Sequence, residues 1–264
     1  MSAAAVMDRQ VNVWQNKLKS NIKVAGSGSP VVFLHGAGGL VWDQFLDTLA
    51  RRHTVYAPEF PGTTPGDPDA IAQIDNLWDL VLYYDELLGS LVSGPVPVIG
   101  HSFGAMLAAE LAAHHYDRVS KLVLMCPIGL WREDVPIPNW MIAPPEDLPN
   151  LLLSDAKGPL AQQMFGGEPQ PEMQIKMIWS MACTGKFIWP IPDKGLKKRI
   201  HRIHAPTLVL WGRQDRLVPV AYAQEFAGRI AGAKVELIDR AGHLLTAEHP
   251  ARVAETIENF LSAG

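Results

Sequence analysis

The chain has 264 residues, 48% of them hydrophobic, and a formal net charge of −4. This length can bury a sizeable core, and the scattered cations of a weakly acidic chain leave no basic face for nucleic acid. No apolar stretch is long enough to be a membrane span. We therefore expect a globular protein with a small-molecule substrate and neither a nucleic-acid nor a membrane partner, and nothing indicates its oligomeric state.

Residues 1–10 lack the cationic start and the long apolar run of a signal peptide. The two cysteines, Cys126 and Cys183, lie far apart in the sequence. This favours free thiols in a reducing compartment, although a single disulfide stays open. These features predict a cytoplasmic protein.

Strand and helix patterns alternate along most of the chain, which predicts a mostly parallel sheet with helices on both faces. The first half predicts, in order, strands at 11–17, 21–24 and 31–34, a helix at 42–49, a strand at 54–57 and a helix at 71–91. Next come a strand at 95–99, a helix at 105–115 and a strand at 121–126. The last part predicts a strand at 207–211, a helix at 221–230, a strand at 234–238 and a helix at 250–261.

The alternation breaks between residues 127 and 197. This segment is rich in Pro, Met and Trp, and its prolines divide it into short helices and loops without a convincing strand. The basic stretch 194–202 predicts a solvated helix that leads into the strand at 207–211.

The motif Gly100-His101-Ser102-Phe103-Gly104 lies where the buried strand at 95–99 gives way to the helix at 105–115. A nucleophile elbow needs this context, because the sharp turn raises the serine hydroxyl above the sheet. Glycines flank the serine because a Cβ at either place would collide with neighbouring backbone. The motif predicts that Ser102 is a nucleophile.

A serine nucleophile needs a nearby base, and the base needs a carboxylate that orients it. Asp215 directly follows the predicted strand 207–211, and His243 follows the strand 234–238. Either residue alone has a structural explanation, as a turn aspartate or a packed histidine. Together with Ser102, in the order Ser, Asp, His and each after a strand, they predict a catalytic triad.

The charge that develops on a tetrahedral intermediate needs pre-aimed N–H donors. We predict the backbone amides of Phe103, at the start of the helix, and of Ala37, in the glycine-rich loop after the third strand. That loop has an alternative interpretation as a dinucleotide-binding turn, since 36–38 reads G-x-G and Glu59 follows a strand. The third glycine of that fingerprint is missing, because position 41 is Val41.

These motifs resemble those of the α/β-hydrolase superfamily, in its serine-nucleophile, esterase- or lactonase-like branch with a cap. The residues in register are His35-Gly36, Phe60-Pro61-Gly62, Gly100 to Gly104, Ala205-Pro206-Thr207, Gly212 to Asp215, Gly242-His243 and Glu248-His249-Pro250. The resemblance implies an α/β-hydrolase fold whose core comprises residues 1–129 and 198–264, with a helical cap or lid at 130–197 after the sixth strand. It also implies hydrolysis of carboxylic esters or lactones through an acyl-enzyme, with no cofactor and no metal.

Other enzyme classes of the superfamily fit the motif residues of this chain less well. A serine at the elbow disfavours epoxide hydrolases and haloalkane dehalogenases, which use a carboxylate nucleophile. The C–C hydrolases of ring-cleavage products commonly carry Asn before the nucleophile and Trp after the histidine, where this chain has His101 and Leu244. C–C hydrolysis and a slow-turnover binding protein are the alternatives.

The segment 130–197 bears on the substrate because it is unusually rich in methionine and aromatic residues. Most of these side chains are expected to pack the segment on the core, and methionine also adapts to varied apolar groups. We predict a pocket for a modest-sized hydrophobic substrate, lined by Trp131, Met141, Met177, Trp189 and Leu244.

Overall fold

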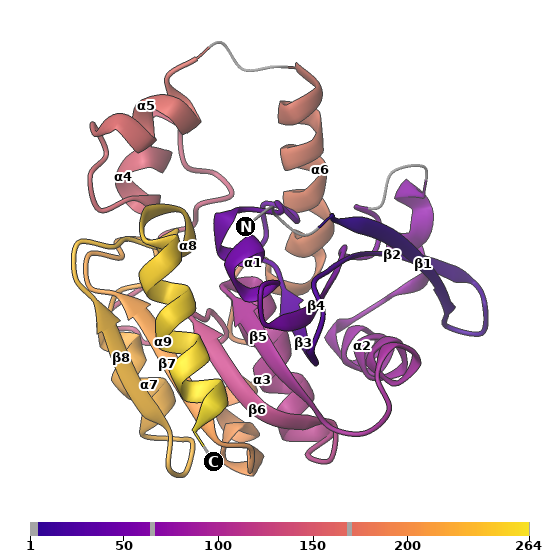
Figure 1. Cartoon of the computed structure of the whole chain (residues 1–264). Coiled ribbons are helices and arrows are strands. Elements are labelled where there is room, and N and C mark those ends of the chain that lie inside the picture. Colours follow the sequence, from indigo (N-terminus) through magenta and orange to yellow (C-terminus); the bar gives the residue numbers. More distant parts are fainter. Residues whose placement is uncertain (1–4, 64–66, 168–170, 264) are drawn as a thin grey trace.

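The computed structural model describes residues 5–63, 67–167 and 171–263. Residues 1–4, which are part of the segment 1–10 that lacks signal-peptide features, lie outside the described residues. One eight-stranded sheet runs through the molecule (Figure 1), in the order β1-β2-β4-β3-β5-β6-β7-β8. Its strands are β1 Met7–Val13, β2 Leu18–Ala25, β3 Ser29–Leu34, β4 His53–Pro58, β5 Val96–His101, β6 Val119–Met125, β7 Thr207–Gly212 and β8 Lys234–Ile238. The pairs β1–β2 and β2–β4 are antiparallel, and all other neighbours are parallel.

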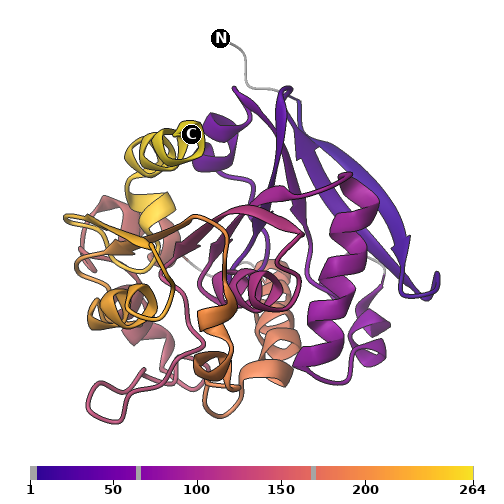
Figure 2. The same ribbon diagram turned by 90° about the horizontal axis from the view of Figure 1, so that it is seen from below.

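Helices cover both faces of this sheet. In Figure 2, α1 and α9 lie together on one face, and α2, α3 and α7 lie on the other. The α-helices are α1 Gln44–Leu49, α2 Leu77–Leu91, α3 Phe103–His114, α4 Leu148–Leu152, α5 Pro159–Phe165, α6 Pro171–Ile188, α7 Ala221–Ala227, α8 Leu245–Glu248 and α9 Pro250–Ser262. The central strands β5 and β6 are mostly buried, which is why residues 96–99 and 122–125 are continuous apolar runs rather than alternating ones. The predicted fold class is confirmed.

The predictions for the strands at 11–17 and 21–24 and for the helix at 71–91 differ most from the structure. The first hairpin turns at Trp14, Gln15 and Asn16, which all have φ near +60°, so β1 ends at Val13 and β2 begins at Leu18. The predicted helix 71–91 is wrong in its first part. A 3-10 helix, η1 (Pro68–Gln73), precedes α2, which begins only after Asn76, whose side chain caps it by accepting from the Asp79 amide at 3.0 Å.

The basic stretch 194–202 does not form a solvated helix. It forms two 3-10 helices, η3 (Leu196–Lys198) and η4 (Ile200–Arg202), in which Leu196 and Ile200 are fully buried. Between them, the guanidinium of Arg199 donates two hydrogen bonds, of 2.8 and 2.5 Å, to the carboxylate of the buried Glu110 of α3. The apolar positions and this ion pair hold the stretch against the core.

The chain between β6 and β7 forms an insertion above one end of the sheet (Figure 1), with helices α4, α5 and α6 and a 3-10 helix, η2 (Pro145–Asp147). The N-terminal half of α6 stands away from the rest of the molecule. In the described parts of the chain, no helix combines the length and the apolar character needed to cross a bilayer.

Candidate active site

Ser102 lies on the sharp turn between β5 and α3, with φ 54° and ψ −113°. Its amide donates to the carbonyl of Met125 on β6 at 2.9 Å, which anchors the turn to the neighbouring strand. A Cβ on Gly104 would lie 2.1 Å from the Leu34 carbonyl oxygen, and one on Gly100 would lie 2.5 Å from the Gly104 carbonyl oxygen. Only glycine at both places lets α3 approach β3 this closely, so the turn depends on the motif.

Ser102, His243 and Asp215 form a continuous chain of hydrogen bonds. The Nε2 atom of His243 lies 2.9 Å from the Ser102 hydroxyl, and its Nδ1 lies 2.8 Å from Oδ2 of Asp215. The three side chains are buried and come from loops after β5, β8 and β7, whose carboxyl ends meet at one edge of the parallel sheet. This arrangement suits transfer of the serine proton to the imidazole.

The second carboxylate oxygen of Asp215 accepts hydrogen bonds from the amides of Leu217 and Val218 at 2.9 and 2.8 Å. These two bonds fix the direction of the carboxylate, so its other oxygen faces His243. The Asp215 carboxylate thereby holds the imidazole in the orientation that places Nε2 against the serine.

Cys126, which follows β6, is the nearest group that could join this site in binding a metal. Its sulfur and the ligand atoms of Asp215 and His243 all lie within 4.8 Å of one another, the one such group found in the described residues. Burial raises the pKa of the Cys126 thiol well above its usual value, and the charge of Asp215 acts in the same direction. The thiol is therefore protonated at neutral pH and is a poor metal ligand. Both Cys126 and Cys183 are free thiols.

Of the two predicted oxyanion donors, Phe103 directly follows Ser102, and Ala37 follows Gly36, where an added Cβ would lie 3.5 Å from the Ser102 Cβ. Phe103 is the first residue of α3, so its N–H has no carbonyl of an earlier helical turn to bind. The Ala37 N–H has no acceptor among the described residues. The carbonyl of the same peptide group, at Gly36, accepts from Nδ1 of His35 at 2.7 Å. Because N–H and C=O of a trans peptide point in opposite directions, the Ala37 N–H faces away from His35.

His35 is held as a neutral ring. Its Nε2 accepts from the Phe60 amide at 3.1 Å while Nδ1 donates to Gly36, so the hydrogen bonds specify one tautomer. Burial lowers the pKa of His35 to about 4. The ring therefore stays uncharged beside the loop at neutral pH.

The alternative of a dinucleotide site is not supported by the loop after β3. The following helix begins only at Gln44, and the carboxylate of Asp43 caps it by accepting from the Leu46 amide at 3.0 Å. A carboxylate already occupies the helix end where a pyrophosphate would bind.

The model of the alpha/beta hydrolase family matches residues 31–256, which include all three residues of the hydrogen-bonded chain. The chain belongs to the alpha/beta hydrolase family.

Among its relatives, this hydrolase is 26% identical to a 2-hydroxymuconate semialdehyde hydrolase from Pseudomonas sp. (strain CF600), over 93% of this chain and 91% of that protein. It is also 26% identical to a monoacylglycerol lipase from Xenopus laevis, over 90% of this chain and 77% of that protein.

Solved structures share the fold. A 2-hydroxy-6-oxo-6-phenylhexa-2,4-dienoate hydrolase from Rhodococcus sp. strain RHA1 matches with a TM-score of 0.75 at 20% identity, covering 98% of this chain and 100% of that one. Naproxen esterase from Bacillus subtilis has the same TM-score at 16% identity, covering 98% and 92%. Fold likeness therefore does not separate esterases from C–C hydrolases.

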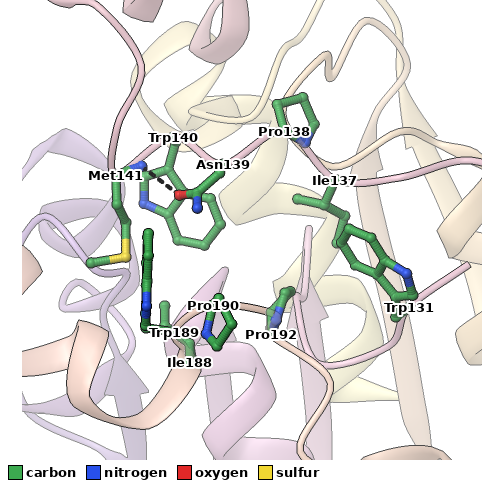
Figure 3. Close-up of a pocket in the computed structure, with 10 residues that line it drawn as sticks. All are labelled: Trp131, Ile137, Pro138, Asn139, Trp140, Met141, Ile188, Trp189, Pro190 and Pro192. Atoms are coloured by element: carbon green, nitrogen blue, oxygen red, sulfur yellow. Dashed lines mark hydrogen bonds between the residues drawn. The ribbon is translucent and has the colours of Figure 1, made fainter. Parts of the chain in front are cut away.

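Only some of the residues predicted to line a substrate pocket in this hydrolase lie around a common pocket. Trp131, Met141 and Trp189 line one pocket together with Trp140 and several prolines (Figure 3). This pocket is made by the insertion alone, between residues 131–141 and 188–192, and no triad residue lines it.

The other two predicted pocket residues lie elsewhere. Met177 is 40% exposed on the projecting half of α6. Leu244 follows His243, and its amide donates to the Leu152 carbonyl of the insertion at 3.0 Å. Leu244 is the one predicted pocket residue that is adjacent in sequence to the triad.

Sequence reasoning assigned no role to two residues, Arg216 and Glu248, that hold the site of the hydrolase together. Arg216 donates from Nη1 to the carbonyls of Asn150 and Leu153 at 3.2 and 3.0 Å. The Glu248 carboxylate accepts from the amides of Gly242 and Ser154 at 2.5 and 2.8 Å. These bonds tie residues 150–154 of the insertion to both the Asp215 and the His243 loops. Arg216 is adjacent to Asp215 in the sequence, which was the available signal.

Proposed function

We propose that this alpha/beta hydrolase is a serine hydrolase that cleaves carboxylic esters or lactones through an acyl-enzyme. The observation that carries this is the hydrogen-bonded chain Ser102–His243–Asp215, with bonds of 2.9 and 2.8 Å and no intervening group. The proposed donors to the oxyanion are the amides of Phe103, which follows Ser102 at the start of α3, and of Ala37, in the loop after β3.

The reaction follows from this geometry. The Ser102 oxygen attacks the ester carbonyl carbon while Nε2 of His243 takes the hydroxyl proton, and the amides of Ala37 and Phe103 hold the negative oxygen. The same imidazole passes the proton to the leaving alcohol, and the carbonyl re-forms as an acyl-enzyme. Water then attacks with His243 as base and releases the acid. Asp215 stabilises the imidazolium formed in both halves.

We further propose that the insertion, residues 130–197, is a cap over this site and that the substrate is hydrophobic and modest in size. Support comes from its apolar side chains, including Met177 and Trp179, which stay 40% and 43% exposed on α6. The bonds from Arg216 and Glu248 to residues 150–154 place one side of the insertion next to the triad loops. The monoacylglycerol lipase relative is consistent with an acyl substrate.

A second candidate is hydrolysis of a C–C bond in a ring-cleavage product. It is favoured by the 26% identity to 2-hydroxymuconate semialdehyde hydrolase over 93% of this chain. The same three residues serve either reaction, so the triad alone does not decide between them, whereas His101 and Leu244 depart from the Asn and Trp that C–C hydrolases commonly carry.

The test has two stages. Wild-type protein and Ser102→Ala are incubated with a fluorophosphonate, and the mass of the peptide that carries position 102 is measured. The proposal expects one adduct on the wild type and none on the variant; an unlabelled wild type would overturn it. Values of kcat/KM for aryl esters of increasing acyl length, lactones and a dienoate ring-cleavage product then discriminate the candidates. A large preference for the dienoate would assign C–C hydrolysis.

A further inference from the structure

Ser180 joins the insertion to the loop that carries the predicted oxyanion donor Ala37. It lies in the middle of α6, is fully buried, and donates from Oγ to the Ala37 carbonyl oxygen at 2.9 Å. The two residues are 143 positions apart in the sequence. This is a direct bond between the insertion and the catalytic core.

The bond orients the loop at the peptide that follows Ala37. Residues 36–39 make a tight turn, closed by the Gly39 amide donating to the Gly36 carbonyl at 3.2 Å. Gly39 has φ +98°, and a Cβ there would lie 3.3 Å from the Ser180 oxygen, so α6 and the turn are in contact. A buried carbonyl needs a partner, and among the described residues Ser180 is the one that binds the Ala37 oxygen.

The same helix contacts the residue that supplies the other donor, through a row of aromatic rings. Phe187 of α6 meets Phe60 edge-on with ring centroids 5.8 Å apart, and Phe60 meets Phe103 edge-on at 5.4 Å. The indole nitrogen of Trp179 also donates to the Gly62 carbonyl at 2.7 Å, which fixes α6 against the turn after β4. Helix α6 is therefore attached to the surroundings of both amides.

We propose that Ser180 is a positioning residue for the oxyanion hole. By binding the Ala37 carbonyl it limits rotation of the turn, and this keeps the Ala37 N–H directed at the charge that develops on the substrate oxygen. The insertion then contributes to the rate of the chemical step as well as covering the substrate. This inference rests on the proposed function, since it requires an oxyanion.

Two substitutions and one matched control test it. Ser180→Ala removes the hydroxyl, and Ser180→Thr retains it. Thr184→Val is the control, because Thr184 is also fully buried on α6, one turn later. Among the described residues its hydroxyl bonds only to the Ser180 and Met181 carbonyls of the same helix. For each protein we would measure kcat and KM on an aryl ester, the affinity of an aryl boronic acid, and the free energy of unfolding in urea.

We expect Ser180→Ala to lower kcat and boronic acid affinity about tenfold, less than the 10²–10³ lost when a donor itself is removed. KM should change less than about twofold, because the ground-state carbonyl depends less on the hole. Ser180→Thr should retain most of the wild-type kcat. Thr184→Val should retain the wild-type kcat even if it loses as much stability as Ser180→Ala.

Equal effects of Ser180→Ala and Thr184→Val on kcat would overturn the proposal, as would a loss confined to KM. Were Ser180→Ala too unstable to assay, failure of the folded Ser180→Thr variant to retain kcat would count against it. A wild type that neither turns over esters nor reacts with a fluorophosphonate would instead refute the proposed function, so the two failures are distinguishable.

Discussion

The Nε2 atom of His101 lies 2.9 Å from the backbone carbonyl oxygen of His243, to which it donates a hydrogen bond. The residue that precedes the nucleophile thus fixes the backbone of the residue whose side chain accepts the serine proton. Their rings are tilted against one another with centroids 5.1 Å apart. Burial and the nearby His243 lower the pKa of His101 to about 4, so the ring is neutral at physiological pH.

This burial predicts acid sensitivity. His35 and His101 both have a pKa of about 4 in the folded protein, against about 6.5 in an unfolded chain. The unfolded state therefore takes up protons first as the pH falls below about 6.5, and stability declines toward pH 4. Between about pH 7.5 and pH 5 each histidine should lower the free energy of unfolding by about 2 kcal/mol.

Urea unfolding at a series of pH values would measure this decline. His101→Gln keeps a donor at the Nε2 position and His35→Asn keeps one at Nδ1, yet neither new side chain titrates. Each variant should show a shallower fall in stability over this pH range, whatever its stability at neutral pH. A pH dependence identical to that of the wild type would show that the two rings are not the source.

Asp215→Asn should lower kcat by about 10⁴-fold while the protein stays folded. The new amide keeps the size of the carboxylate but has no charge to stabilise an imidazolium. Its NH2 group can also donate to Nδ1 of His243, which favours the tautomer whose Nε2 cannot accept the serine proton. Steady-state kinetics on an aryl ester would measure the loss. Asp239→Asn is the control, because Asp239, directly after β8, is an exposed carboxylate paired with the exposed Arg213. Comparable losses in both variants would contradict the assignment.

Gly104→Ala should prevent folding or cost at least about 3 kcal/mol of unfolding free energy, because its Cβ would lie 2.1 Å from the Leu34 carbonyl oxygen. Backbone on both sides of the contact belongs to β3 and α3 and has little room to move. Gly167→Ala is the matched control, since a Cβ there meets no atom of the described residues within 4 Å. Soluble yield and thermal unfolding would compare the two; a stable, native-like Gly104→Ala protein would show that the elbow tolerates a side chain.

Arg199→Met should destabilise the fold by about 3 kcal/mol, because it leaves the carboxylate of Glu110 buried without its bidentate partner. The Met side chain keeps much of the apolar stem of Arg199. Lys197→Met is the control: Lys197 is half-exposed, and its ion pair with Asp193 should contribute less than about 1 kcal/mol. Chemical denaturation would measure both. Adding Glu110→Gln to Arg199→Met should recover part of the lost stability, because the buried group is then neutral. A double variant no more stable than Arg199→Met would contradict the explanation that an unpaired Glu110 carboxylate causes the loss.

Much of the fold was predictable because its signals are local. Runs such as 122–126 are apolar on both sides since both faces of the sheet are covered. Asp215 follows the fully buried strand β7, and His243 follows the edge strand β8, whose exposed and partly buried residues alternate. The interruption before α2 was missed because apolar periodicity continues across it: Ile74 is fully buried although it lies outside the helix. The cap formed by Asn76 was the overlooked signal.

The pocket prediction shows where such reasoning stops. The composition of residues 130–197 shows that many of their side chains are apolar. It does not show which of these side chains line the same pocket, because that depends on how the insertion folds. Trp131, Met141 and Trp189 line one pocket within the insertion, whereas Met177 stands exposed on α6.

By itself, the sequence determined the alternation of strands and helices, the elbow at Ser102 and the order of the three hydrogen-bonded residues, because each depends on neighbours a few positions away. Tertiary structure decided that His101 holds the backbone of His243 and that Ser180 holds the Ala37 carbonyl. These pairs lie 142 and 143 positions apart, and nothing local marks them. Their contact exists only because packing of the sheet and of α6 brings those backbones together and leaves their buried polar groups to satisfy one another.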